Sequence, residues 1–241
     1  GSRAQAYGLL GHGGDTTLGN RSGDVFVRAA GEVQLLAGAA TRAASMIGHG
    51  GYDGDGDHFG NILVSAGSGA LATHLGTGLF DDLGDYDLDG SADLIQFAPV
   101  TAGQSSVRVT AAGGTDAFAM IGHGGRSSGN VLGTTAASTM TGHVGVAAHG
   151  DIVVSGSSST RSFAQIGHGG WEDPAQNMTL GGDISVVSQS GLLRVLAGTG
   201  SEAYAMVGHG ALRNTATNVP LGSRSGSIYI EAGNWEVVPT G

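Results

Sequence analysis

A histidine flanked by glycines recurs five times, each time after a short run of small and aliphatic residues. Histidine transfers protons near neutral pH and binds metals, so five copies could form a row of catalytic or metal sites. Catalysis needs one specialised constellation, however, and no acidic residue recurs beside these histidines. We therefore interpret them as structural residues of a corner that ends a strand, where stacked imidazoles form a ladder and bond backbone carbonyls. The five are His12, His49, His123, His168 and His209.

The acidic residues indicate a different chemistry. Nine aspartates lie between residues 53 and 93, a stretch without Arg, so the net charge of −10 is a local feature. The segment DYDLDGSAD has the pattern D-x-D-x-D-G-x-x-D, which brings alternate oxygen ligands to one point, as calcium loops do. The expected Ca²⁺ ligands are Asp85, Asp87, Asp89 and Asp93 with their side chains, and Ser91 with its carbonyl. A second, weaker site is expected at Asp53, Asp55, Asp57 and Asn61. The alternative for each is a solvated acidic turn.

The elements that position these residues are repeated strands. Aligned on the histidines, with Thr77 in a degenerate sixth copy, the repeat interval varies from 28 residues (His49 to Thr77) to 46 residues (Thr77 to His123). The residues two and four places before each anchor are aliphatic or small, which predicts an inward face. The residues three and five places before are more mixed, which predicts an outward face. We expect its rings to pack against a loop or a neighbouring chain: Tyr7, Phe118, Phe163 and Tyr204.

A second strand recurs in every copy, and its first and third residues are always Val or Ile. This alternation predicts one buried face, and the first residues of the six runs should form one inward column. They are Val25, Ile62, Val107, Ile152, Ile184 and Ile228. A third strand begins after Gly31 and returns after Gly191 and, loosely, after Gly233.

These patterns predict an all-β fold: a repetitive β-solenoid, most simply a parallel β-helix, of about six repeat units. Gly supplies 47 of 241 residues, and 40% of the chain is apolar. We expect one solenoid region over 1–241, part of a longer or self-assembling chain, with an acidic calcium-loop insert at 78–100. A propeller has a similar period, but its hairpin signals are absent.

Composition also excludes several classes of function. The chain has no Cys and therefore no disulfide framework. It has no apolar run long enough for a transmembrane helix, and no basic stripe of the kind that binds nucleic acid. A polysaccharide-active β-helix enzyme is a weak alternative. Its candidate acids are sparse and none pairs visibly with a basic cluster: Asp116, Asp151, Asp173 and Asp183.

The G-D-I-x-V-x-A units and IGHGG corners together resemble large bacterial surface exoproteins, the filamentous-haemagglutinin-like and autotransporter adhesins. The acidic segment resembles the calcium loops of FG-GAP repeats over about a dozen residues. The first resemblance implies secretion, an extracellular or cell-surface location, and adhesion or fibre-building rather than catalysis. Its partners would be copies of itself or a host or surface ligand. A self-assembling filament or sheath subunit is the alternative with the same fold.

Overall fold

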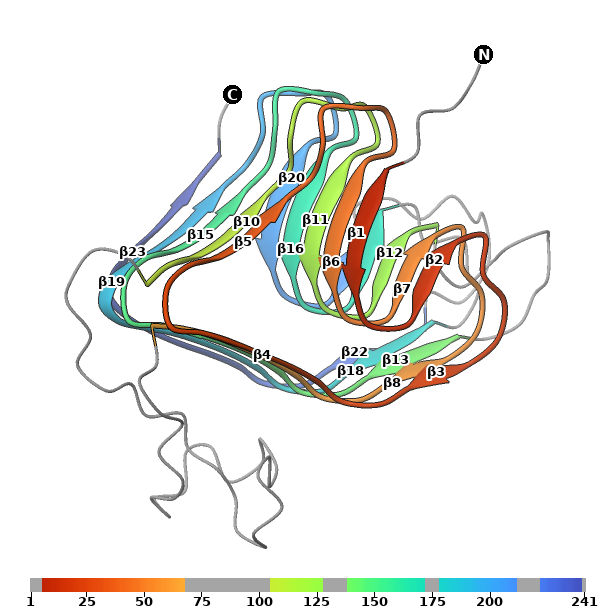
Figure 1. The fold of residues 1–241 in the computed structure, drawn as a ribbon, viewed down its shortest axis with the longest axis horizontal. Helices are drawn as coiled ribbons and strands as arrows, with labels where there is room; N and C mark the ends of the chain where they lie inside the picture. Colours follow the sequence, from red (N-terminus) through yellow and green to blue (C-terminus); the bar gives the residue numbers. More distant parts are fainter. Residues whose placement is uncertain (1–5, 68–104, 128–137, 172–177, 212–221, 240–241) are drawn as a thin grey trace, which may run out of the picture.

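The computed structural model describes residues 6–67, 105–127, 138–171, 178–211 and 222–239 (Figure 1). Within these ranges the protein consists of 23 strands without a helix, and the strands pair in parallel. The strands form four separate sheets. The expected all-β, parallel architecture is therefore confirmed. Four sheets make it more elaborate than a stack of simple strand-turn-strand units.

The chain passes through the four sheets five times, and we call each passage a coil. The first coil contains β1 (Tyr7–Leu10), β2 (Gly13–Asp15), β3 (Arg21–Ser22), β4 (Val25–Ala29) and β5 (Val33–Leu36). The second contains β6 (Ala44–Ile47), β7 (Gly50–Tyr52), β8 (His58–Phe59), β9 (Ile62–Ala66) and β10 (Val107–Thr110). The third contains β11 (Phe118–Ile121), β12 (Gly124–Arg126), β13 (Thr139–Thr141), β14 (Val144–Ala148) and β15 (Ile152–Ser155).

In the last two coils the fourth and fifth strands merge into one long strand. The fourth coil contains β16 (Phe163–Ile166), β17 (Gly169–Trp171), β18 (Thr179–Gly181) and β19 (Ile184–Leu196). The fifth contains β20 (Tyr204–Val207), β21 (Gly210–Ala211), β22 (Arg224–Ser225) and β23 (Ile228–Val238). Sheets 1, 2 and 3 comprise the first, second and third strands of the coils, and sheet 4 comprises all the remaining strands.

The described residues contain five stacked repeats rather than the six expected. In sheet 1, β6 pairs with β1 at one edge and with β11 at the other, with Ala44 opposite both Tyr7 and Phe118. Both edges of β6 are thus occupied, and no further strand lies between β6 and β11. The degenerate copy around Thr77 and the insert expected at 78–100 lie outside the described residues.

The Val and Ile residues expected in one column belong to two. Val25, Ile62, Ile184 and Ile228 share a register position, and Val144 occupies the third-coil place in that column. The expected members Val107 and Ile152 instead align with Val33 and Leu193, in the column of the third strand. The error arose because the alternating pattern is the same in both strands, so sequence alone does not distinguish them. The expected burial is confirmed for Ile62, Val107, Ile152 and Ile184. Val25 in the first coil is half-buried, and Ile228 in the fifth coil is 51% exposed.

The main core lies between sheet 1 and sheet 4, and the small and aliphatic positions of sheet 1 point into it, as expected. Ile47, Ala119 and Ile121 pack there with Val64 and Val107 of sheet 4. Most of these side chains are almost fully inaccessible. Each large one contributes about 1.5–3 kcal/mol relative to an exposed position. This core holds the coils together along the stacking direction.

The opposite face of sheet 1, expected to point outward, packs in a second core against sheet 2. Phe118 and Phe163 are inaccessible, and their rings stack with centroids 5.0 Å apart. The rings rest on glycine-rich strands, where a Cβ at Gly125 would lie 3.1 Å from the Phe118 ring. The aromatic column therefore packs against sheet 2 of its own chain, not against a loop or a neighbouring chain as expected. Its sequence pattern resembled a surface because sheet 2 covers it mainly with backbone.

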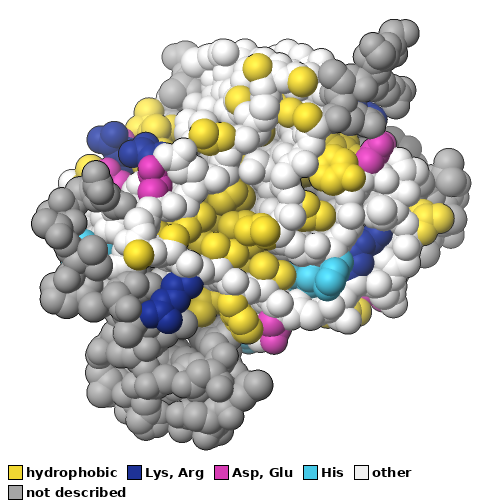
Figure 2. All heavy atoms as spheres, viewed as in Figure 1, with side chains coloured by type: hydrophobic (Ala, Val, Ile, Leu, Met, Phe, Trp, Pro, Cys, Tyr) yellow, Lys and Arg dark blue, Asp and Glu magenta, His cyan; other side chains and the backbone are white. Residues whose placement is uncertain are grey.

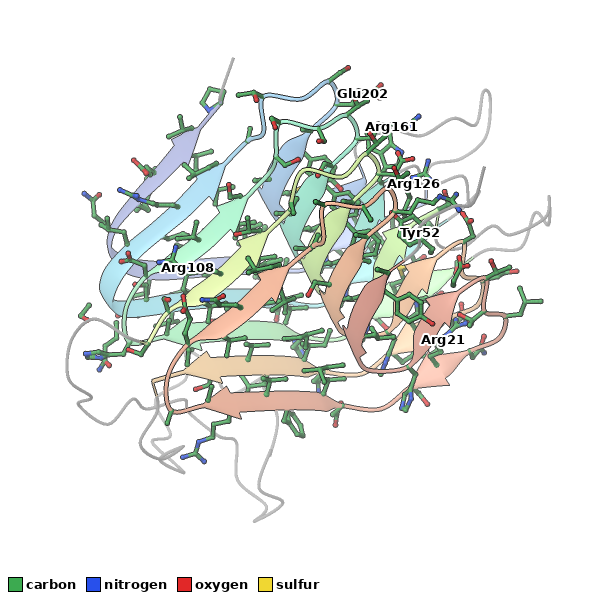
Figure 3. The ribbon with its side chains drawn as sticks, turned by 45° about the horizontal axis from the view of Figure 1, so that its top comes forward. Arg21, Tyr52, Arg108, Arg126, Arg161 and Glu202 are labelled. Carbon is green, nitrogen blue, oxygen red and sulfur yellow. The ribbon has the colours of Figure 1, made fainter. Side chains whose placement is uncertain are left out.

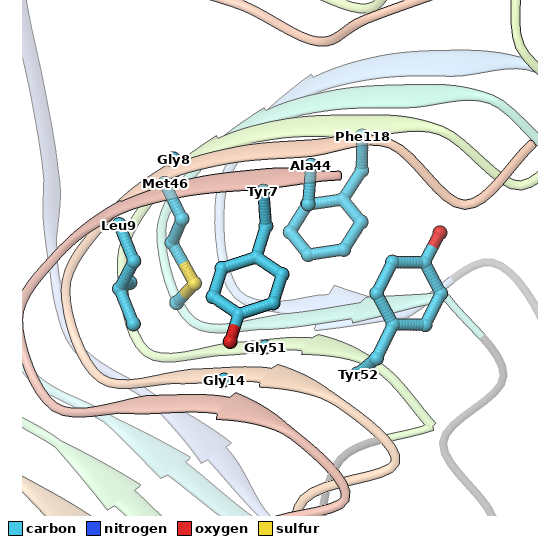
Figure 4. Close-up of a pocket in the computed structure, with 9 residues that line it drawn as sticks. All are labelled: Tyr7, Gly8, Leu9, Gly14, Ala44, Met46, Gly51, Tyr52 and Phe118. Atoms are coloured by element: carbon cyan, nitrogen blue, oxygen red, sulfur yellow. The ribbon is translucent and has the colours of Figure 1, made fainter. Parts of the chain in front are cut away.

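The second coil interrupts this aromatic column with Ala44 (Figure 4). Tyr52 of sheet 2 lies beside this place, and its ring centroid is 5.3 Å from that of Phe118. Tyr7, Leu9 and Met46 complete a small apolar pocket there.

Candidate functional site

Each recurring histidine lies at the corner between a strand of sheet 1 and a strand of sheet 2. The flanking glycines have φ between 114° and 153° at all five corners, a conformation that L side chains rarely adopt. The coils also approach one another too closely here for a side chain. A Cβ added at Gly48 would lie 2.0 Å from the carbonyl oxygen of Gly122 in the next coil. The Gly-His-Gly pattern is therefore required by backbone geometry.

The five imidazole rings stack in a continuous ladder through the coils. Successive ring centroids are 5.0, 4.8, 4.7 and 4.8 Å apart from His12 to His209, and neighbouring planes differ by 20° or less. This spacing matches the distance between hydrogen-bonded strands. The ladder expected from the sequence is confirmed.

Both nitrogens of the inner rings take part in hydrogen bonds. The backbone N–H of each histidine donates to Nδ1 of the histidine in the following coil, over 3.0–3.1 Å. Nε2 of the same ring lies 2.7–2.9 Å from a carbonyl oxygen that precedes sheet 4; the acceptors are those of Gly23, Gly60, Gly142 and Gly182. A carbonyl only accepts, so Nε2 carries the hydrogen and Nδ1 presents its lone pair. The rings are thus fixed as one neutral tautomer.

Burial reinforces this neutral state. Desolvation lowers the pKa of His123 to about 3 and holds the pKa of His168 well below its usual value. It also lowers the pKa of His49 and of His209. A metal or a proton needs a nitrogen lone pair, and Nδ1 of the four later rings already accepts a backbone N–H. The arrangement joins the coils and leaves none of these four rings poised for acid–base chemistry near neutral pH.

A second polar ladder, which sequence analysis missed, precedes the first strands of sheet 4. The residue just before the Val or Ile run of each coil donates its backbone N–H to the side chain of the equivalent residue in the preceding coil, over 2.6–3.2 Å. The accepting side chains are those of Asp24, Asn61, His143 and Asp183, and the last donor is the N–H of Ser227. The signal in the sequence was the polar residue before each Val or Ile run. Three residue types perform the same task because each presents an acceptor at similar reach.

The weaker predicted calcium site is spread over several coil contacts. Asp53 forms an ion pair with Arg42 at 3.4 Å, and Asp55 accepts the N–H of the next residue. Asp57 accepts the N–H of Thr139 in the third coil, and Asn61 belongs to the second polar ladder. Across the described ranges, no group of three or more His, Cys, Asp or Glu is placed to hold a metal ion. The structure therefore does not support calcium at these four residues.

The stronger calcium prediction stays a prediction, because its residues lie outside the described ranges. They are Asp85, Asp87, Asp89, Ser91 and Asp93.

A charged cluster lies where the chain enters sheet 1 (Figure 3). Arg42, Asp116, Arg161 and Glu202 occupy equivalent places in successive coils, with φ of 57–62°, so the sign of the charge alternates along the stack. Asp116 lies 2.6 Å from Nε of Arg161 and 3.6 Å from Nε of Arg126. One acid does therefore pair with basic residues, contrary to the sequence interpretation.

Tyr52 completes this cluster from sheet 2. The Arg42 guanidinium lies 5.2 Å from the centroid of the Tyr52 ring, within the range of a cation–π contact. The Tyr52 hydroxyl donates to the backbone carbonyl of Asp116, and burial raises the pKa of this phenol above its usual value. Tyr52 thus contacts both the Arg42 guanidinium and the Asp116 backbone from the sheet that faces them.

No family model, curated protein or solved structure matches this chain. In the part of the chain that the structure describes, no helix is long and apolar enough to cross a membrane.

Proposed function

We propose that this chain is a β-solenoid segment of an extracellular or cell-surface protein, where it serves as a stalk or fibre that supports adhesion. The observation that carries the proposal is the reuse of one polar device in all five coils. The hydrogen-bonding groups of each histidine corner join one coil to the next. No single coil therefore gains a distinct chemistry from its histidine. A catalytic protein would distinguish one coil from the others. A structural rod requires them all to be alike.

The mechanical role follows from the direction of these bonds. Each coil adds one step of 4.7–5.0 Å, as the spacing of the histidine rings shows. Two polar ladders, two cores and the parallel backbone pairing all cross every junction between coils. Bending or pulling the stack would have to break several of these contacts together. Such a segment keeps a fixed length between whatever it joins.

The location is tested by labelling cells of the source organism with an antibody against this chain. Labelling of intact cells, or recovery of the chain from the medium, is the expected result. A cytoplasmic marker serves as the control for leakage. Labelling that appears only after the cells are permeabilised would overturn the surface proposal.

We also propose that the acidic segment binds Ca²⁺ with the residues of 85–93. Calorimetric titration should detect one calcium ion per chain, and the paired changes Asp87→Ala and Asp89→Ala should abolish it. Asp55→Ala is the matched control, because Asp55 accepts a local backbone N–H and should leave the stoichiometry unchanged. Absence of binding to the unaltered chain would refute the proposal and leave a solvated turn.

A further inference from the structure

The outer face of sheet 4 is inaccessible along β9 and β14. The core positions of β9 are Ile62 and Val64. Because side chains alternate along a strand, Leu63 and Ser65 point the opposite way, away from the main core. Leu63 is nevertheless only 3% exposed, and Ser65 is 1% exposed. Ala147, which lies opposite Ser65 in β14, is also 1% exposed.

The other half of the same outer face is accessible. In β5, β10 and β15 all the outward residues are half-buried or exposed. Figure 1 shows no described strand on the outer side of β9 and β14. Neither Leu63 nor Ala147 belongs to a hydrophobic cluster of the described residues. The described strands therefore do not account for the burial of these two side chains.

Ser65 provides an independent polar signal at the same place. Its Oγ is buried and has no hydrogen-bond partner among the described residues. A buried hydroxyl without a partner is costly, so native proteins rarely leave one unexplained. We interpret the outer face of β9 and β14 as a surface that another part of a polypeptide occupies.

The segment 68–104 leaves and re-enters the fold at the edge of this surface. Gly67 follows β9, and its N–H donates to the Ala29 carbonyl in the first coil over 2.8 Å. Ser105 lies shortly before β10, and its carbonyl accepts the N–H of Gly150 in the third coil over 2.9 Å. Without 68–104, three residues would join β9 to β10, the same number that joins β4 to β5 and β14 to β15. The segment is therefore an insertion in a corner that is complete without it.

The composition of 68–104 is complementary to the surface. The segment contains six Asp and no Glu, Arg or Lys, and apolar residues flank its acidic stretch at 79–80 and 94–97. The surface offers apolar Leu63, and Arg28 lies opposite Ser65 in β4. Figure 2 shows hydrophobic and basic side chains together over β4. Both the apolar and the charged parts of the surface thus have a counterpart in the segment.

We propose that the segment 68–104 docks on the outer face of β9 and β14, with apolar side chains over Leu63 and Ala147 and an aspartate near Arg28. This contact fixes the acidic segment at one place on the side of the stack. The inference does not depend on the proposed stalk function, and it holds whether or not the segment binds calcium.

The first experiment measures access to the surface with a single thiol. The chain has no Cys, so Ser65→Cys introduces one reactive group of similar size to the hydroxyl. Ser155→Cys is the matched control, because Ser155 points outward from β15 and is half-buried. Deletion of 68–104 should raise the rate at which a soluble maleimide labels Ser65→Cys at least tenfold, and should change labelling of Ser155→Cys less than twofold. Equal rates for Ser65→Cys with and without the segment would overturn the proposal.

A second measurement keeps the segment at full length, in case the shortened chain does not fold. Phe80→Ser together with Phe97→Ser should raise labelling of Ser65→Cys at least threefold, because both changes weaken the apolar contact. Thr73→Ser with Thr77→Ser is the control and should leave the rate unchanged. Equal effects of the two pairs would contradict the docking. Protection of Ser65→Cys that appears only at high protein concentration would assign the surface to a second copy and overturn the proposal.

A third measurement tests the charge contact at low salt and with chelator present, so that no cation neutralises the aspartates. Arg28→Glu should raise labelling of Ser65→Cys several-fold, because it places like charges together. Arg108→Glu is the matched control, since Arg108 pairs with Glu32 at 2.7 Å on the other half of the face. It should leave the rate unchanged. An Arg28→Glu variant with undiminished protection, or equal effects of the two changes, would refute the assigned charge contact.

Discussion

Acid should weaken this fold steeply, because several buried histidines fold in their neutral form. Desolvation lowers the pKa of His58 and of His123 to about 3, and holds the pKa of His168 well below its usual value. All three side chains are inaccessible. Below pH 6.5 these three histidines bind protons in the unfolded chain but stay neutral in the folded chain. Their contribution to stability is therefore complete above pH 6.5 and is lost as pH falls toward the folded values.

The size of the effect follows from linkage. One such histidine lowers the free energy of unfolding by about 2 kcal/mol between about pH 7.5 and pH 5. Three of them give about 6 kcal/mol, comparable with the whole stability of many domains. Protonation of Nδ1 in a ladder ring would also set two donors against each other, since that nitrogen accepts the N–H of His49 in the case of His123.

Urea denaturation followed by circular dichroism at several pH values tests this reasoning. His123→Asn is the informative variant, because Asn61 and His143 show that both residue types accept equivalent backbone N–H groups in the second ladder. At pH 7.5 the free energy of unfolding of the variant should be about 1–2 kcal/mol lower, because the hydrogen bond from the ring to the Gly60 carbonyl is lost. The free energy of unfolding of the variant should then fall less steeply as the pH is lowered, because its unfolding takes up about one proton fewer.

The control for this experiment is His149→Asn, because His149 bonds the side chain of Gln189 at the surface. It should leave the pH dependence unchanged. An unaltered chain whose stability is flat between pH 7.5 and pH 5, or a His123→Asn variant with the full acid slope, would refute the role assigned to the ladder.

Three further changes test the packing by urea denaturation. Gly124→Ala should prevent stable folding, because the added Cβ would lie 2.0 Å from a carbonyl oxygen of the next coil. Gly8→Ala is the control and should be tolerated, because its Cβ would meet no atom within 4 Å. Equal effects of the two changes would contradict the close approach of the coils. Asp116→Asn should lower the free energy of unfolding by about 2–4 kcal/mol, because it removes the carboxylate charge beside Arg126 and Arg161. A loss below about 0.5 kcal/mol would show that the pairing is unimportant. Tyr52→Ala should cost about 3 kcal/mol, and adding Ala44→Phe should restore part of it; no rescue would show that the two rings do not share one space.

The sequence predicted the local chemistry better than the arrangement of the strands. It identified the corner, the ladder of His12 to His209 and the inward aliphatic faces, because each depends on a pattern that repeats in every coil. It placed Val107 and Ile152 in the wrong column, because two strands of a coil share the same alternation. Only the pairing register, which depends on the whole coil, separates them.

The second core was not predicted from the sequence, for a different reason. Phe118 and Phe163 lie beside Met120 and Gln165 on a face that looks half polar. Burial there depends on sheet 2, whose glycines carry no hydrophobic signal. Gln165 is buried because its amide donates to backbone carbonyls at the corner, including that of His168. The sequence pattern predicts that such a polar residue lies on the surface, although its hydrogen bonds allow it to be buried.

The connection between sheets 2 and 3 varies in length from coil to coil, while the corners do not. In the first coil it runs from the end of β2 at Asp15 to the start of β3 at Arg21, and in the third from Arg126 to Thr139. The fixed corners and the variable connection lie on the same framework, so residues can be added at one place without disturbing any ladder. A lineage could therefore diversify its surface there by insertion and retain its scaffold. For an engineer, the same connections are the natural sites at which to graft a row of peptide epitopes, spaced coil by coil along one side.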